Sequence, residues 1–313
     1  MGDDANATGD AGATAGGDPR VVADTHNHTG EGPIYHPDEH AVYWLDIPNG
    51  DLFRYDLASE EYERVLDDDG MVGGFTTQDD GDLLLFCDEG RIQPWSPGSG
   101  LRDPVVESID GHDDFRFNDV IADPRGRVYA GTIHQTDPVE HPGDLYRVDT
   151  DGSLTTLETD MAIPNGMGFA PDRSQFYFTE TVGGHIFRYD YDQSTGEITD
   201  REVFVDTDSV EGNPDGMTVD AEGHVWVAFW GGERVARYDP SGEEVARVTF
   251  PAKKISCVTF GDADYDTAFV TTALGPGEGE AGTREEEGEG AGALFAVDLG
   301  VGGMPEFRSR IES

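Results

Sequence analysis

Residues 212–232 read GNPDGMTVDAEGHVWVAFWGG, and this stretch decides the fold. Its Asn-Pro-Asp-Gly segment, residues 213–216, is typical of a turn that leads into a strand. A short strand is expected at residues 217–219, an apolar strand at residues 224–230 and a third strand at residues 234–238. Successive short strands joined by tight turns indicate an antiparallel meander.

The same unit recurs along the chain with spacings of 41 to 49 residues. Each copy has a polar turn, an apolar strand and a further strand, which in most copies ends in Arg-Tyr-Asp or a related signature. The apolar strands are expected at residues 42–44, 83–85, 127–129, 175–177, 224–226 and 267–269. Six small antiparallel sheets with this period predict an all-β protein, a six-bladed β-propeller whose innermost strands surround a central channel.

Two segments interrupt the repeat and suggest the domain limits. Residues 1–20 have neither an apolar core nor a basic start, so we expect a disordered acidic tail and not a signal peptide. Residues 21–313 are expected to form a single propeller domain, closed by a strand at residues 21–23 beside the C-terminal segment near Phe307. In its last blade, the Gly- and Glu-rich residues 275–292 predict a solvated loop.

The charge and hydropathy of the chain limit the classes of partner that it can bind. It has 65 acidic and 20 basic residues, a net charge of −45, and the acidity is spread along the whole sequence, as in halophilic proteins. No basic stripe is present to bind nucleic acid, and no apolar run reaches the ~18 residues of a membrane span. We therefore expect a cytoplasmic protein. Cys87 and Cys257 lie in apolar strands and predict buried free thiols.

Oxygen donors occur at matching places in three repeats. Glu31 precedes the first apolar strand, Asn165 the fourth and Asp215 the fifth. Equivalent positions of inner propeller strands converge, so these side chains are expected to line a metal-binding channel. A set made of oxygens alone suits Ca²⁺ or Mg²⁺, with Mn²⁺ or Zn²⁺ as further options. The alternative is that Asn-Gly and Asp-Gly only mark turns.

Other polar residues are further candidates for a site. Arg116 and Asn118 begin the third repeat and are expected at the same end of the channel, where they suit the oxygens of a polyhydroxylated substrate. The alternative is an ordinary ion pair and a turn cap. Residues 24–28 read DTHNH, a pattern that opens metal hydrolases built on TIM barrels, but this chain lacks the alternating βα pattern of that fold.

Several motifs in combination carry a specific resemblance. They cover nearly the whole chain and read GEGPIYHPDEHAVYWLDIPNGDLFRYD, RFNDVIADPRGRVYAGT, IPNGMGFAPDRSQFYFTET, NPDGMTVDAEGHVWVAFWGGERVARYDP and SCVTFGDADYDTAFVTTA. The chain resembles the gluconolactonase/regucalcin (senescence-marker-protein) family. The resemblance implies a six-bladed propeller with one divalent metal in its channel. It matches Glu31, Asn165 and Asp215 to the metal ligands, and Asp215 also to the proposed acid/base. It matches Arg116 and Asn118 to substrate contacts.

The resemblance also implies an activity. We expect a lactonase that opens a sugar lactone, such as gluconolactone or a pentonolactone, to the aldonic acid in oxidative sugar degradation, with Ca²⁺ as the favoured cation. Where relatives place glutamates that hold the sugar, this chain has Gln135 and Thr136, so the sugar is not predicted. Two alternatives stay open, a related propeller esterase or phosphotriesterase and a non-catalytic calcium-binding or regulatory propeller.

The net charge of −45 predicts that folding and activity need molar salt. At ~0.1 M salt, charge repulsion still extends over about 10 Å, so carboxylates repel one another across the surface. Circular dichroism and turnover, measured during dialysis from molar to dilute salt, should both decline together. Full structure and activity in dilute buffer would contradict this prediction.

Overall fold

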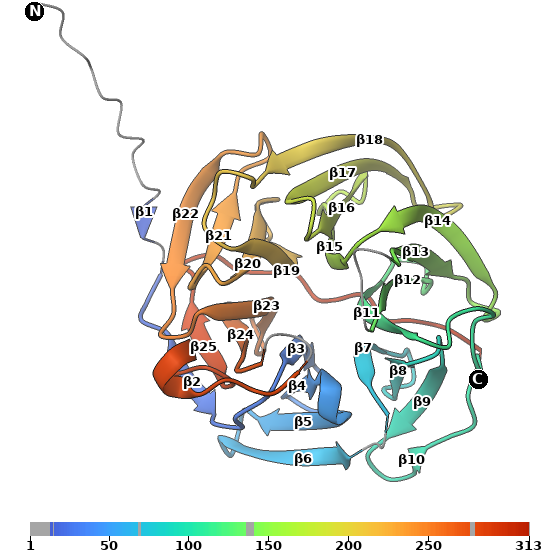
Figure 1. Cartoon of the computed structure of the whole chain (residues 1–313), viewed down its shortest axis with the longest axis horizontal. Helices are drawn as coiled ribbons and strands as arrows, with labels where there is room; N and C mark the ends of the chain where they lie inside the picture. The colour runs from blue at the N-terminus through green and yellow to red at the C-terminus, as the bar shows by residue number, and fades with distance from the viewer. Residues whose placement is uncertain (1–12, 15, 68–69, 136–140, 276–278, 313) are drawn as a thin grey trace, which may run out of the picture.

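The structure is a computed structural model that describes residues 13–14, 16–67, 70–135, 141–275 and 279–312. Its β-sheets radiate from a common centre, so that the molecule has the form of a ring (Figure 1). Within the described residues, the helical elements are η1 (Ile47–Asn49) and α1 (Arg284–Glu287). The all-β propeller predicted from the repeats is confirmed. None of the described helices is long and apolar enough to cross a membrane.

Four sheets contain four antiparallel strands each. Their strands are β3 (Gly30–His36), β4 (Ala41–Asp46), β5 (Asp51–Asp56) and β6 (Glu61–Asp67); β7 (Val72–Thr77), β8 (Leu83–Cys87), β9 (Ile92–Ser96) and β10 (Gly100–Leu101); β11 (Phe115–Ala122), β12 (Val128–His134), β13 (Gly143–Val148) and β14 (Leu154–Met161); and β15 (Pro164–Phe169), β16 (Gln175–Glu180), β17 (His185–Asp192) and β18 (Glu197–Asp206).

The remaining strands form one nine-stranded sheet with two parts. The strands of the first part are β19 (Asn213–Val219), β20 (Val225–Trp230), β21 (Arg234–Tyr238), β22 (Glu244–Thr249) and β1 (Ala13–Thr14). The strands of the second part are β23 (Lys254–Gly261), β24 (Thr267–Ala273), β25 (Leu294–Asp298) and β2 (Arg20–Ala23). A single residue pair, Trp230 with Lys254, joins the two parts.

The innermost strands form a closed ring around the centre. These strands are β3, β7, β11, β15, β19 and β23, each of which contacts the next, and β23 contacts β3 (Figure 1). The core lies between neighbouring sheets. In β8, for example, Leu83 and Leu85 pack toward the sheet that begins with β3, whereas Leu84 and Phe86 pack toward the sheet that begins with β11. Side chains alternate along a strand, so a strand between two sheets is apolar on both faces. Cys87 and Cys257 are buried free thiols, as predicted.

An N-terminal strand closes the ring, but not where the sequence placed it. β2 pairs antiparallel with β25, with Val21 opposite Phe295. The predicted partner near Phe307 is therefore wrong, because β25 already supplies the free sheet edge that the N-terminal strand needs. Phe307 instead lies at the centre of the ring.

The two segments that interrupt the repeat also differ from their predictions. Residues 1–12 and 15 of the predicted tail lie outside the described residues, and the limit at residue 20 stays a prediction. The described part of the predicted N-terminal tail contacts the propeller. β1 runs parallel to β22, and the N–H of Gly17 donates to the carbonyl of Asp298 at 2.8 Å. In the predicted loop 275–292, α1 forms and residues 290–292 are buried, so a wholly solvated loop is wrong.

The C-terminal segment 302–312 crosses the centre of the ring (Figure 1). It bonds to the far ends of inner strands or to the turns that follow them: Ala221 N–H donates to the carbonyl of Gly302, Arg310 N–H to that of Gly126 and Ser309 N–H to that of Thr77, the last residue of β7. The predicted site residues lie near the other ends of these strands. The C-terminal segment therefore covers the end of the channel opposite the candidate site.

Candidate functional site

Each inner strand has an irregularity near its first residues. The register of pairing with the second strand shifts after Glu31 in β3, Phe117 in β11, Asn165 in β15 and Pro214 in β19, and comparable shifts occur in β7 and β23. A β-bulge turns side chains out of the regular alternation, and such bulges are frequent next to active sites. In β3, β15 and β19 the bulges lie at or beside Glu31, Asn165 and Asp215, so these three residues share one level near the starts of their strands.

The three predicted metal ligands come together at this level. The Nδ2 of Asn165 donates a short hydrogen bond to Oδ1 of Asp215, from the neighbouring sheet. Glu31 lies close enough to raise the pKa of Asp215 by charge repulsion. The structure thus gathers two carboxylates and an amide from three separate sheets. Their role as ligands stays a prediction.

Like charges dominate the electrostatics of this cluster. Burial raises the pKa of Asp215 well above its ordinary value, and Glu31 and Asp119 raise it further. Burial, followed by Asp119, raises the pKa of Glu31 to about 8, against a smaller lowering effect of Arg116. Burial also raises the pKa of Asp119 itself to about 6. The ionised carboxylates are therefore unfavourable together, and the cluster favours either protons or a cation.

The glycines beside the predicted ligands have a packing role, which corrects their interpretation as turn signals. Gly166 follows Asn165 and Gly216 follows Asp215, and both dipeptides lie inside strands. A Cβ on Gly166 would overlap the carbonyl oxygen of Asp215, and one on Gly216 would overlap Cys257. Glycine is required because neighbouring inner strands approach closely at the channel.

The chemistry of this donor set fits a hard divalent cation. Asp215 is 4% exposed, and the carboxylate of Glu31 and the amide of Asn165 offer further oxygen atoms beside it. Oxygen-only sets of this kind hold Ca²⁺ or Mg²⁺. No group of three or more His, Cys, Asp or Glu suited to a metal occurs among the described residues. The predicted set contains only two residues of those types, and its third donor is an amide.

Arg116 and Asn118 are buried on β11 and contact one another. The Nη1 of Arg116 donates to Oδ1 of Asn118 at 2.7 Å and to the carbonyl of Phe117 at 2.9 Å. The Nδ2 of Asn118 donates to the carbonyl of Pro164 at 2.8 Å. Asn118 therefore contacts the strand that carries Asn165, a contact that the sequence did not predict.

Other residues singled out in the sequence lie around this end of the channel. Gln135 donates from Nε2 to the carbonyl of Phe115 at 3.0 Å, whereas Thr136 lies outside the described residues. His28, from the DTHNH pattern, lies 2.9 Å from Thr29 Oγ1 through Nδ1 and 2.8 Å from the Gly279 carbonyl through Nε2. His28 thereby links the start of β3 to the segment 275–292.

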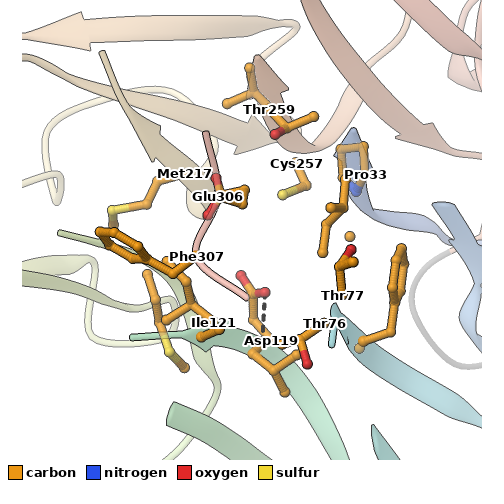
Figure 2. A pocket seen from close by; sticks show the side chains of 18 residues that line it. Pro33, Thr76, Thr77, Asp119, Ile121, Met217, Cys257, Thr259, Glu306 and Phe307 are labelled. Carbon is orange, nitrogen blue, oxygen red and sulfur yellow. Dashed lines mark hydrogen bonds between the residues drawn. The ribbon is translucent and has the colours of Figure 1, made fainter. Parts of the chain in front are cut away.

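The channel continues below the cluster into a cavity of about 50 Å³. Figure 2 shows Asp119 and Glu306 on its wall, with Cys257 and Met217 from neighbouring strands and Phe307 from the C-terminal segment. Burial and the charge of Asp119 raise the pKa of Glu306 to about 7. Sequence reasoning missed Asp119, although it directly follows Asn118. No sequence pattern marked Glu306 as a site residue, because it lies outside every repeat.

The fold and this cluster define a β-propeller with a carboxylate site in its channel. The family model described as "SMP-30/Gluconolactonase/LRE-like region" matches residues 29–274. This chain belongs to that family.

Relatives cover almost the whole chain. Pentonolactonase XacC from Haloferax volcanii is 46% identical over 93% of this chain and 97% of its own length. Regucalcin from Homo sapiens is 30% identical over 89% of this chain and 93% of its own length. Among solved structures, a regucalcin from Agrobacterium tumefaciens, described as a calcium-binding protein, has a TM-score of 0.87 at 28% identity, covering 96% of this chain and 100% of that one.

The raised pKa values predict how the stability of the metal-free protein depends on pH. The pKa of Glu31 rises from 4.5 to about 8 and that of Asp119 from 3.8 to about 6, so the folded state retains protons that the unfolded chain has released. Their contribution to the free energy of unfolding therefore falls as the pH rises through this window. We expect the Tm in EDTA and molar salt to fall between about pH 5 and pH 8.

Adding Ca²⁺ is the control, since a bound cation stabilises ionised carboxylates. Ca²⁺ should raise the Tm more at about pH 8 than at about pH 5, as measured by scanning calorimetry. A Tm in EDTA that rises steadily across this range would contradict the assignment of like-charge repulsion to the cluster.

Proposed function

We propose that this chain is a metal-dependent lactonase that hydrolyses a sugar lactone to the open aldonic acid. The observation that carries the proposal is that Asn165 and Asp215, from two sheets, are hydrogen-bonded, and that Glu31, from a third sheet, lies near enough to repel the Asp215 carboxylate. The substrate class rests on the relative named pentonolactonase, which is 46% identical over 93% of this chain.

The finer architecture belongs to the same proposal. We take the two parts of the nine-stranded sheet as two blades, since a single residue pair joins them and each part has its own inner strand. Together with the four separate sheets, this makes six blades around a metal-binding channel. The repeat length of the sequence supports the same count.

The cation that we propose is Ca²⁺ in the first place, held by Glu31, Asn165 and Asp215. The solved regucalcin described as a calcium-binding protein supports this choice. When bound, a divalent cation supplies Lewis-acid polarisation of the lactone carbonyl and stabilises negative charge on its oxygen.

The residues of the chain then have separate tasks. Asp215 takes a proton from the water that attacks the carbonyl carbon, and returns a proton to the ring oxygen as the C–O bond of the lactone breaks. Arg116 and Asn118 bind substrate oxygens at the mouth of the channel. Arg116 also orients the Asn118 amide through the 2.7 Å hydrogen bond to its Oδ1.

A substrate panel tests the function. Protein in molar salt, loaded with Ca²⁺, Mg²⁺, Mn²⁺ or Zn²⁺ in turn, would be assayed with gluconolactone, pentonolactones, an aryl ester and a phosphotriester. We expect turnover of an aldonolactone that EDTA abolishes and the cation restores. Preferred turnover of the aryl ester or the phosphotriester would favour the related propeller hydrolase.

A calcium-binding protein without catalysis is the second candidate. The solved regucalcin from Agrobacterium tumefaciens favours it, because that protein is described by calcium binding and not by a reaction. Tight Ca²⁺ binding by this chain without turnover of any lactone would support this candidate and overturn the lactonase.

Replacing Asp215 should impair turnover more than replacing Asn165. An amide oxygen still coordinates a hard cation but cannot take a proton from water, so Asp215→Asn should lower kcat by ~10²–10⁴ while weakened cation binding survives. Asn165→Asp keeps the proton acceptor and should retain more activity. Steady-state kinetics at saturating cation, with binding checked by calorimetry, measures both effects.

The pH–rate profile gives an independent readout of the same variant. The acid limb assigned to Asp215 should vanish in Asp215→Asn. Turnover at near the wild-type rate with cation bound would reduce Asp215 to a ligand, and Glu31 would become the next candidate for the base.

A further inference from the structure

The backbone just before each predicted ligand is held by a side chain from another sheet. The hydroxyl of Ser256 donates to the carbonyl of Gly30, which precedes Glu31, at 2.5 Å. The hydroxyl of Thr181 donates to the carbonyl of Pro214, which precedes Asp215, at 2.9 Å.

The third ligand has the same arrangement. The Nδ2 of Asn118 donates to the carbonyl of Pro164, which precedes Asn165, at 2.8 Å. Asn118 and Ser256 lie on inner strands and Thr181 directly follows β16, and each of the three bonds crosses to the inner strand of the next sheet in the ring. The three bonds therefore share one kind of acceptor, the carbonyl directly before a predicted ligand, although their donors are serine, threonine and asparagine.

The need for such bonds follows from the ring. The inner strands β3, β15 and β19 each pair with one strand only, so some of their carbonyls face away from that strand and need other partners. A bulge at this level disrupts the ladder further. A cross-sheet donor satisfies the carbonyl, and it also determines where the next side chain points.

Thr181 has a second contact, which connects it to another predicted ligand. Its Oγ1 accepts a hydrogen bond from Nδ2 of Asn165 at 3.3 Å while it donates to Pro214. One hydroxyl thus connects two predicted ligands on adjacent sheets. Ser256 is fully buried, and its Oγ also lies 3.0 Å from Oγ1 of Thr271, which restricts its rotation.

We propose that Ser256 and Thr181 are positioning residues, whose hydroxyls hold Glu31 and Asp215 in the arrangement that binds the cation. The proposal rests on the proposed function, since it concerns the same site. Without the hydroxyl, the carbonyl loses its donor and the ligand that follows becomes free to move. Residues that orient metal ligands typically change metal affinity by ~10–100-fold when they are replaced.

Calorimetric titration of the metal-free protein with Ca²⁺ in molar salt tests the proposal. We expect Ser256→Ala and Thr181→Val each to raise the Kd for Ca²⁺ by about 10-fold or more. Thr181→Ser keeps the hydroxyl, and its Kd for Ca²⁺ should stay close to that of the wild type.

Two matched variants control for the loss of any buried hydroxyl. Thr207 is 3% exposed and donates to the Gly184 carbonyl at 2.8 Å, and Ser309 is fully buried with its Oγ 2.7 Å from Oγ1 of Thr76. Neither bond precedes a predicted ligand. Thr207→Val and Ser309→Ala should lower the Tm of the metal-free protein as much as the site variants do, and leave the Kd unchanged.

The outcomes separate this inference from the proposed function. Wild-type protein that binds no divalent cation would overturn the proposed site itself. Wild-type binding with an unchanged Kd in Ser256→Ala and Thr181→Val would overturn the positioning role alone. An equal rise of the Kd in the control variants would do the same, because the effect would then come from general loosening of the fold.

Discussion

The rest of this structure depends on one constraint: backbone groups at the channel edge of each sheet need hydrogen-bond partners. Six inner strands meet around one axis, and each has backbone groups that its own sheet cannot pair. Three features accommodate these edges: bulges at one level, glycines where strands approach closely, and hydrogen-bond donors that cross between sheets. The same level carries Glu31, Asn165 and Asp215. The features that close the ring therefore also build the candidate site.

Charge imposes a second constraint, which acts against the first. The chain has a net charge of −45, yet it places Glu31, Asp119, Asp215 and Glu306 along one narrow channel. Burial raises the pKa of all four carboxyls, and neighbouring carboxylates raise those of Glu31, Asp215 and Glu306 further, so the cluster is unfavourable when ionised and without a cation. The surrounding sheets have to hold it in place. Apolar packing between sheets, as on both faces of β8, supplies that rigidity.

Much of the fold was predictable because it is local and repeated. Strands with apolar residues on both faces, such as Leu83–Cys87, stand out in the sequence because each sheet is covered on two sides. The three oxygen donors were predictable because they occupy equivalent positions in their repeats. The prediction failed where a segment has no repeat to compare with. Phe307 and Glu306 enter the centre of the ring through contacts of the C-terminal segment with distant turns, which no local pattern encodes.

The sequence by itself determined the all-β propeller, the repeat length and the positions of Glu31, Asn165 and Asp215 near the starts of inner strands. It did so because strand periodicity and turn chemistry act over a few residues, and repetition amplifies them. Only the tertiary structure decided that Asn165-Gly166 and Asp215-Gly216 lie inside bulged strands, and that Ser256 and Thr181 contact the backbone before two of the predicted ligands. Those contacts join residues that are 33 and 226 positions apart, so they form only when the ring closes and brings the strand edges together.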